Sequence, residues 1–305
     1  MITSKKSQML WPPLTIGLLV GILVFFFLGS DELYSLPEYV VGTRAQHVLL
    51  QEAYAQKEYT YTDLIGKYSS WQALFDLGAN GGVYDPRSHP CGQVQNEIVL
   101  WNRASPARPC FPTKEMLVKN YSPYVQKAMN TYLLRHYLGE ALQDNYRISL
   151  IEKENNTHII GIALKPMYYT FPPPSASKAD LGKGSFSFSP PTVTSHPNIP
   201  DGKIITALYA LKLDFHTQLP YSFDQFVVVG QKANETLQTC ALEEVRSCVE
   251  RKKTEFTTPD QTWEVQIFAN DIYTFKVTDH LSNPYFEKEP VYAFALHIPP
   301  SQPTP

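Results

Sequence analysis

Residues Ser88 to Gly92, SHPCG in single-letter code, place His89 two positions before Cys91. An imidazole near a thiol can favour the thiolate, the form that attacks acyl groups. The same histidine would suit zinc if further nitrogen or carboxylate ligands joined it. Cys110, however, lies close enough in the sequence to bond Cys91, and a disulfide sulfur is not a nucleophile. The segment is therefore a candidate site with a competing structural role.

This segment partly resembles two kinds of cell-wall enzyme. The L,D-transpeptidases have a Ser-His-Gly-Cys motif around a thiol nucleophile, but here Pro90 replaces the glycine. The zinc peptidases that trim cell-wall D-alanine have a glycine three residues after their first histidine ligand, as Gly92 follows His89, but Asn96 occupies their aspartate position. Neither motif is complete, so we assign no catalytic residue and predict no metal or cofactor. A divergent hydrolase or transpeptidase around His89 and Cys91 stays an alternative function.

The four cysteines form two local pairs, Cys91 with Cys110 and Cys240 with Cys248. In an oxidising compartment the simplest interpretation is two disulfides, although four cysteines allow three pairings. Each disulfide would stabilise the fold by about 2.5 to 3.5 kcal/mol. Positions eight apart on an unbroken helix are about 12 Å apart along its axis, too far for a disulfide. A Cys240–Cys248 bond therefore requires a helix break within residues 241–244.

The chain begins with a long uncharged segment. No charged residue lies between Lys6 and Asp31, and the run from Leu14 to Leu28 is almost wholly apolar. A helix of residues 7–30 would be about 36 Å long, enough to cross a hydrocarbon core about 30 Å thick. Basic residues precede it and acidic residues follow, which favours a cytoplasmic N-terminus and an extracytoplasmic C-terminal region. A cleaved secretory signal is the alternative, and it would export the same residues.

Composition narrows the function further. The formal net charge is −3, and basic residues cluster only at positions 251–253. We therefore exclude nucleic-acid binding, which needs a basic surface. Three sequence patterns are candidate N-glycosylation sites, as suits an exported chain, and they start at Asn120, Asn155 and Asn234.

The periodicity of apolar residues predicts three helical regions and several strands. Helices are expected over residues 44–77, from the N-cap Thr113 to residue 138 with a kink or break at Pro123, and over most of 221–253. Alternating residues predict a β-hairpin at 146–150 and 160–164 around a turn at 154–156. Further strands are expected at 98–101, 211–215, 263–267, 273–277 and 292–298.

These elements predict an α+β fold: an N-terminal transmembrane helix, then helices packed on one face of a mainly antiparallel sheet. We expect the two halves after the anchor to share one body. The regions are a cytoplasmic tip and anchor (1–30), a helical region with the disulfide loop and β-hairpin (31–171), a Pro/Ser-rich loop or linker (172–201), an α+β C-terminal half (202–299) and a tail (300–305).

A series of short motifs runs in order through most of the exported region. They are ALFDLGANGG (73–82), PCG (90–92), LWN (100–102), CFP (110–112), NYRISL (145–150), GIA (161–163) and FALHIP (294–299). In this series the chain resembles uncharacterised, single-pass membrane-anchored envelope proteins of small archaea. The motifs consist of glycine, cysteine and aromatic framework residues. The resemblance implies a shared architecture and a cell-envelope setting, and it carries over no catalytic residue.

We therefore expect a membrane-anchored extracytoplasmic protein with a binding or structural role in the cell envelope. Its partners would be the membrane, through Leu14 to Leu28, and an envelope protein or glycan. An accessory subunit of a membrane complex is a further alternative. Gly17 and Gly21 support it, because two small residues four positions apart let a second helix approach closely.

Overall fold

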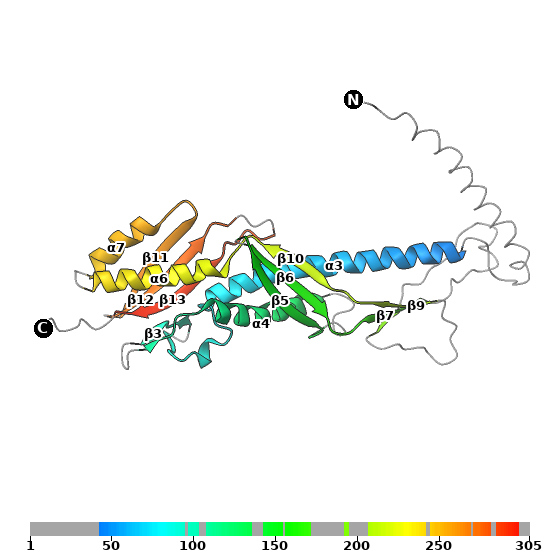
Figure 1. Ribbon diagram of the computed structural model, residues 1–305, viewed down its shortest axis with the longest axis horizontal. Coiled ribbons are helices and arrows are strands. Elements are labelled where there is room, and N and C mark those ends of the chain that lie inside the picture. Colours follow the sequence, from blue (N-terminus) through cyan, green and yellow to red (C-terminus); the bar gives the residue numbers. More distant parts are fainter. Residues whose placement is uncertain are drawn as a thin grey trace, which may run out of the picture.

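The computed structural model describes residues 43–94, 97–103, 108–135, 143–154, 156–171, 192–194, 207–241, 245–269, 271–281 and 285–298. The predicted anchor, Leu14 to Leu28, lies outside them. Within these ranges, no helix is both long and apolar enough to cross a membrane. The described elements form an elongated α+β molecule (Figure 1).

The longest element is α3 (Thr43–Ala79), which matches the predicted helix closely. Its 37 residues extend about 55 Å at 1.5 Å per residue. The C-terminal half is buried through Trp71, Leu74 and other apolar side chains. The helix ends where Gly81 and Gly82 adopt positive φ angles of 60° and 81°, and the Gly82 N–H donates to the Leu77 carbonyl at 2.8 Å.

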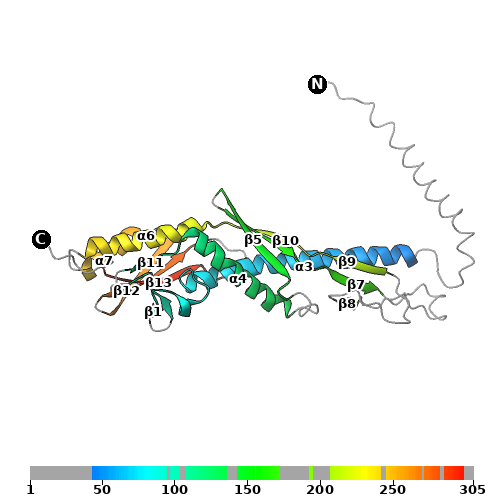
Figure 2. The same ribbon diagram turned by 60° about the horizontal axis from the view of Figure 1, so that its bottom comes forward.

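Helix α4 (Lys114–Leu133) packs along α3 (Figure 2). Thr113 is its N-cap as predicted, because its hydroxyl accepts the Met116 N–H at 3.3 Å. Of the two alternatives at Pro123, a break is wrong, because the helix continues through this residue. The helix ends at Leu133, earlier than predicted, and the Arg135 N–H then donates to the Tyr132 carbonyl in a tighter turn. Residues 136–138 lie outside the described ranges.

The described strands form three separate three-stranded antiparallel sheets and two short two-stranded ones, instead of the one main sheet expected. The first sheet has the order β10-β6-β5, and the second has the order β8-β7-β9. Their bounds are β5 (Tyr146–Lys153), β6 (Asn156–Ala163), β7 (Met167–Phe171), β8 (Thr192–Thr194), β9 (Ala207–Leu211) and β10 (Phe215–Leu219). Both sheets join strands from before and after the predicted linker, and β8 lies within that linker.

The hairpin β5–β6 was predicted correctly, but the strand at 211–215 was not. The structure ends β9 at Leu211 and starts β10 at Phe215. Between them, the Asp214 carboxylate accepts the Ala163 N–H at 2.7 Å and so takes the place of a ladder partner. Leu213 is buried like its neighbours two positions away. The alternating pattern therefore continues through a segment that is not a strand.

The third sheet is an antiparallel meander of β11 (Gln261–Ala269), β12 (Ile272–Asp279) and β13 (Val291–His297). The first two contain the strands predicted there, and β13 ends one residue before the predicted end at 298. Helices α6 (Phe223–Cys240) and α7 (Val245–Phe256) lie beside it (Figure 1). Its core is aromatic, since Trp101 stacks on Phe294 at 3.7 Å between ring centroids, and Phe226 of α6 packs on Tyr292 at 4.7 Å. This sheet and α6 together form the part of the molecule that holds the candidate site.

The cysteine loop between α3 and α4 packs on the edge of the third sheet. The Trp101 N–H donates to the Ala295 carbonyl at 2.9 Å, and Asn102 exchanges hydrogen bonds with the His297 backbone. The loop contains a 3₁₀ turn (Pro86–Ser88) and the short strands β1 (Gln93–Val94), β2 (Ile98–Val99), β3 (Asn102–Arg103) and β4 (Arg108–Pro109).

Candidate functional site

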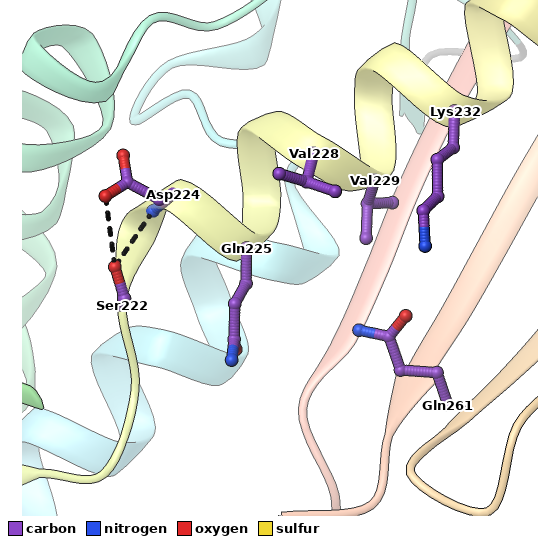
Figure 3. Close-up of a pocket in the computed structure, with 7 residues that line it drawn as sticks. All are labelled: Ser222, Asp224, Gln225, Val228, Val229, Lys232 and Gln261. Carbon is purple, nitrogen blue, oxygen red and sulfur yellow. Dashed lines mark hydrogen bonds between the residues drawn. The ribbon is translucent and has the colours of Figure 1, made fainter. Parts of the chain in front are cut away.

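A hollow beside the first turns of α6 gathers polar side chains in the described part of the molecule (Figure 3). Its volume is about 270 Å³. Its lining residues are Ser222, Asp224, Gln225, Val228, Val229, Lys232 and Gln261. Six of them come from α6 and its N-cap, and Gln261 comes from the start of β11.

The start of α6 fixes one end of the hollow. Ser222 is the N-cap, and its hydroxyl oxygen accepts the Asp224 N–H at 3.2 Å. The same hydroxyl lies 3.4 Å from a carboxylate oxygen of Asp224, so both groups are held together (Figure 3). An acidic side chain in the first turn also suits the positive end of the helix dipole. The carboxylate therefore has a defined position although Asp224 itself is exposed.

An ion-pair cluster ties this end to two other elements. Lys114 of α4 pairs with Asp224 of α6 at 2.7 Å and with Glu152 of β5. Glu152 also accepts the Phe223 N–H at 2.9 Å. The hydrogen bonds that Lys114 donates to Asp224 and Glu152 raise the pKa of its ammonium above the usual value. Three separate elements are thereby joined at the edge of the hollow.

The other end of the hollow lies between α6 and β11. The side chains of Lys232 and Gln261 extend toward one another from the two elements (Figure 3). The Lys232 ammonium also lies 5.9 Å from the ring centroid of Phe256 on α7. Its nitrogen is thus kept close to α7 while it borders the hollow.

Behind Gln261 lies a buried polar cluster. Asp279 is only 4% exposed, and burial raises its pKa, although hydrogen bonds from Gln261 and Tyr292 partly offset this effect. The Tyr292 hydroxyl donates to Asp279 at 3.4 Å. Burial likewise raises the pKa of Tyr292 and Tyr221 well above the usual value, so both phenols stay protonated. Asp279 is also the strand partner of Gln261, so the cluster adjoins one lining residue of the hollow.

The hollow presents several groups that can form hydrogen bonds. Its side chains offer a hydroxyl, a carboxylate, two amides and an ammonium, with Val228 and Val229 between them. The Ser222 hydroxyl is engaged as the N-cap of α6, where it accepts the Asp224 N–H. In the described ranges, no group of three or more His, Cys, Asp or Glu side chains could hold a metal ion. The arrangement suits a small polar ligand, or the polar end of a larger one.

Comparison with known proteins adds no relative from which a role could be transferred. No family model, curated protein or solved structure matches this chain significantly. The chemical interpretation of the hollow therefore rests on its own side chains.

The catalytic candidates from the sequence lie elsewhere, in the cysteine loop. Cys91 is bonded to Cys110, with 6.1 Å between the Cα atoms, and its sulfur is not a thiolate in this state. His89 is 7% exposed, and burial lowers its pKa while a hydrogen bond with the Cys110 backbone partly offsets this effect. Asn96 lies outside the described residues. In the structure the segment is a disulfide-bonded turn.

The second disulfide joins the two helices of the C-terminal half. Cys240 ends α6 and Cys248 lies in the first turns of α7, with 5.5 Å between their Cα atoms. The helix break required by this bond is present, since α6 ends at Cys240 and α7 begins at Val245. All four cysteines lie in the described ranges, and none is free. The predicted pairing is therefore the one that the structure contains.

Two of the candidate glycosylation sites lie on helices. The Asn120 amide on α4 donates to the Gly82 carbonyl at 2.9 Å, so a glycan at this position would displace that bond. Asn234 lies on α6, where the hydroxyl of its sequon Thr236 donates to the Lys232 carbonyl at 2.7 Å. Asn155 lies outside the described residues. Attachment of glycans stays a prediction.

The hollow itself was not predicted from the sequence. The alternation around residue 263 located β11, and the helical pattern located α6, but neither indicated that Gln261 and Lys232 would border one space. The glutamine, serine and lysine residues of the hollow belong to no recognisable sequence motif. The only local signal was the Ser222-x-Asp224 pair, which is a common helix start.

Proposed function

We propose that the protein is a membrane-anchored extracytoplasmic binding protein of the cell envelope, and that the hollow on α6 recognises a polar glycan. The observation that carries this proposal is the convergence of hydroxyl, carboxylate, amide and ammonium groups on one small space. Sugar hydroxyls both donate and accept hydrogen bonds. The amides of Gln225 and Gln261 can do the same, which makes the two surfaces complementary.

Two features support the extracytoplasmic setting. Both disulfides suit an oxidising compartment, and the charges around Leu14 to Leu28 favour export of the chain that follows. The start of α3, the end nearer to the predicted anchor in sequence, lies at the opposite end of the molecule from α6 and β11 (Figures 1 and 2). On this proposal, α3 holds the hollow tens of ångströms from the membrane, where surface polymers are accessible.

Binding of envelope polysaccharide tests the proposal. The full chain in detergent is titrated with polysaccharide fragments released from the envelope of the producing cells. Gln225→Ala removes an exposed amide that lines the hollow, and we expect about fivefold weaker binding from the loss of about 1 kcal/mol. Lys232→Ala removes a charged donor, and we expect about tenfold weaker binding or more.

The control is Gln238→Ala, an exposed glutamine on the same helix that does not line the hollow. It should bind like the unaltered chain. If the chain binds no envelope polysaccharide, the glycan proposal is wrong. If it binds and all three variants bind equally, the hollow is not the recognition site.

The cell-wall enzyme alternative makes a different demand. It requires a reduced thiol at Cys91, whereas this sulfur is bonded to Cys110 and buried in the folded chain. Titration of thiols in folded, unreduced protein separates the two ideas. Complete protection of every thiol supports the binding protein, and an alkylated Cys91 would revive the enzyme.

A further inference from the structure

Two histidines lie side by side on the first sheet. Nδ1 of His158 on β6 is 3.2 Å from Nε2 of His216 on β10. Their rings are within 11° of parallel, with centroids 5.4 Å apart. In the strand register His158 is opposite Gln218 and His216 is opposite Ile160, so the histidines are diagonal neighbours on adjacent strands. Neither side chain is buried.

We propose that His158 and His216 form a chelating site for a divalent transition-metal ion such as Zn²⁺, Ni²⁺ or Cu²⁺. Imidazole nitrogen is a preferred ligand for these ions. Two nitrogens about 2.05 Å from a metal are about 3.3 Å apart in tetrahedral geometry and about 2.9 Å apart at a right angle. The observed separation of 3.2 Å lies between these values. The two nitrogens are therefore already at the spacing that one ion requires.

Only a small movement would aim both lone pairs at one ion. In the hydrogen-bonded pair, both facing nitrogens point along the line that joins them. Tetrahedral binding of one ion requires each ring to turn by about 35° away from this nitrogen–nitrogen line. The terminal torsion of a histidine side chain has a broad energy minimum, so this rotation is inexpensive. The proton shared by the two nitrogens moves to the outer nitrogen of its ring when the ion takes its place. Water would fill the remaining coordination positions.

The backbone beneath the pair is well fixed. Strands β6 and β10 pair over five residues, from Phe215 opposite Gly161 to Leu219 opposite Thr157. On the opposite face, Phe215 packs directly against Gly161 and is 4% exposed. The two histidine backbones are thus held in register before any ion arrives. Such preorganisation distinguishes this pair from two histidines on loops.

The site is independent of the glycan proposal, because it lies on a different sheet from the hollow on α6. Among the described residues, no third His, Cys, Asp or Glu side chain joins the pair to complete a protein-only metal centre. An ion held by two imidazoles keeps open positions for a further ligand. The site would therefore take an exchangeable ion from the surroundings.

Metal titration of the full, untagged chain tests this inference. Binding is measured by isothermal titration calorimetry. We expect one strong site per chain for Ni²⁺ and for Zn²⁺. His158→Gln or His216→Gln should weaken it at least about tenfold, since one imidazole alone cannot chelate. His280→Gln is the matched control, because His280 is a single histidine paired with Glu289 at 2.8 Å. It should bind like the unaltered chain.

A second measurement guards against variants that simply misfold. An ion that binds only the folded chain raises its melting temperature, and the rise grows with ion concentration. We expect this rise in the unaltered chain and in His280→Gln, and its loss in His158→Gln and His216→Gln. If the double variant His158→Gln/His216→Gln binds Ni²⁺ as tightly as the unaltered chain and shows the same rise, the pair is not a metal site.

Discussion

Replacing Gly230 with alanine is expected to destabilise the protein, although alanine is the better helix former. Gly230 lies inside α6, and a Cβ atom added there would be 2.6 Å from Cζ3 of Trp101. The indole cannot move easily, since it is fully buried and stacked on Phe294, and its Nε1–H donates to the Gly81 carbonyl at 3.0 Å. The substitution therefore forces a clash into a closed aromatic core.

The magnitude follows from two opposing effects. Alanine should gain about 0.5 to 1 kcal/mol over glycine in a helix interior. Overpacking a filled core costs about 1 to 3 kcal/mol. The difference between the two effects is about 0 to 2.5 kcal/mol. The 2.6 Å approach to a fixed indole favours the upper part of this range, so we expect Gly230→Ala to lower the free energy of unfolding by about 1 to 2.5 kcal/mol. Guanidinium denaturation of the full chain in detergent, followed by circular dichroism without reductant, measures the change.

A double-mutant cycle gives a sharper test. Trp101→Phe alone should cost about 1 to 3 kcal/mol, because it removes the indole hydrogen bond and leaves unfilled volume. The Gly230→Ala methyl group would enter the space left by the six-membered ring. The double variant should therefore be at least about 1 kcal/mol more stable than the sum of the single changes predicts. Gln231→Ala, an exposed neighbour on α6, serves as the control and should change stability little.

Two results would refute this reasoning. The first is a gain in stability of about 1 kcal/mol for Gly230→Ala, the result expected from helix propensity alone. The second is simple additivity of the two changes. Either result would mean that α6 and Trp101 are not in the close contact that the structure gives.

Three further predictions concern charge. Burial raises the folded-state pKa of Asp279, so the stability that its protonated carboxyl contributes is lost as pH rises from about 3.9 through that raised pKa. The melting temperature of Asp279→Asn minus that of the unaltered chain should therefore be larger at pH 7 than at pH 3.5. Burial lowers the folded-state pKa of His89, so as pH falls below about 6.5 the unfolded chain is protonated at this residue before the folded chain, which destabilises the fold. His89→Gln should therefore reduce the loss of melting temperature between pH 7 and pH 5. Lys114→Met leaves Glu152 and Asp224 without their cation and should cost about 1 kcal/mol at low salt, with a smaller loss in 1 M NaCl, because Lys114 is 37% exposed and therefore partly screened.

Local patterns predicted the elements of this fold well. The Thr113 cap located the start of α4, and the spacing of Cys240 and Cys248 located the break between α6 and α7. These signals succeed because capping and disulfide geometry depend on residues close in sequence. The β5–β6 hairpin belongs to the same class.

Features that depend on distant pairing could not be predicted. His158 and His216 each look like a single histidine in the sequence, and only the register of β6 with β10 brings them together. The division into three sheets likewise depends on pairings across residues 172–201. For the hollow, the polar lining residues are types that usually lie at the surface, so their convergence leaves no local pattern.

The contacts of β13 set the order in which the chain can fold. This strand, the last of those described, supplies the Ala295 and His297 carbonyls that bind the cysteine loop, and it also packs on α3. Contacts between residues so far apart in sequence slow folding, because closing a long loop costs conformational entropy before the contact forms. The cysteine loop therefore stays incompletely packed until almost the whole polypeptide has been synthesised. Chains truncated before residue 291 should accordingly be more sensitive to proteases.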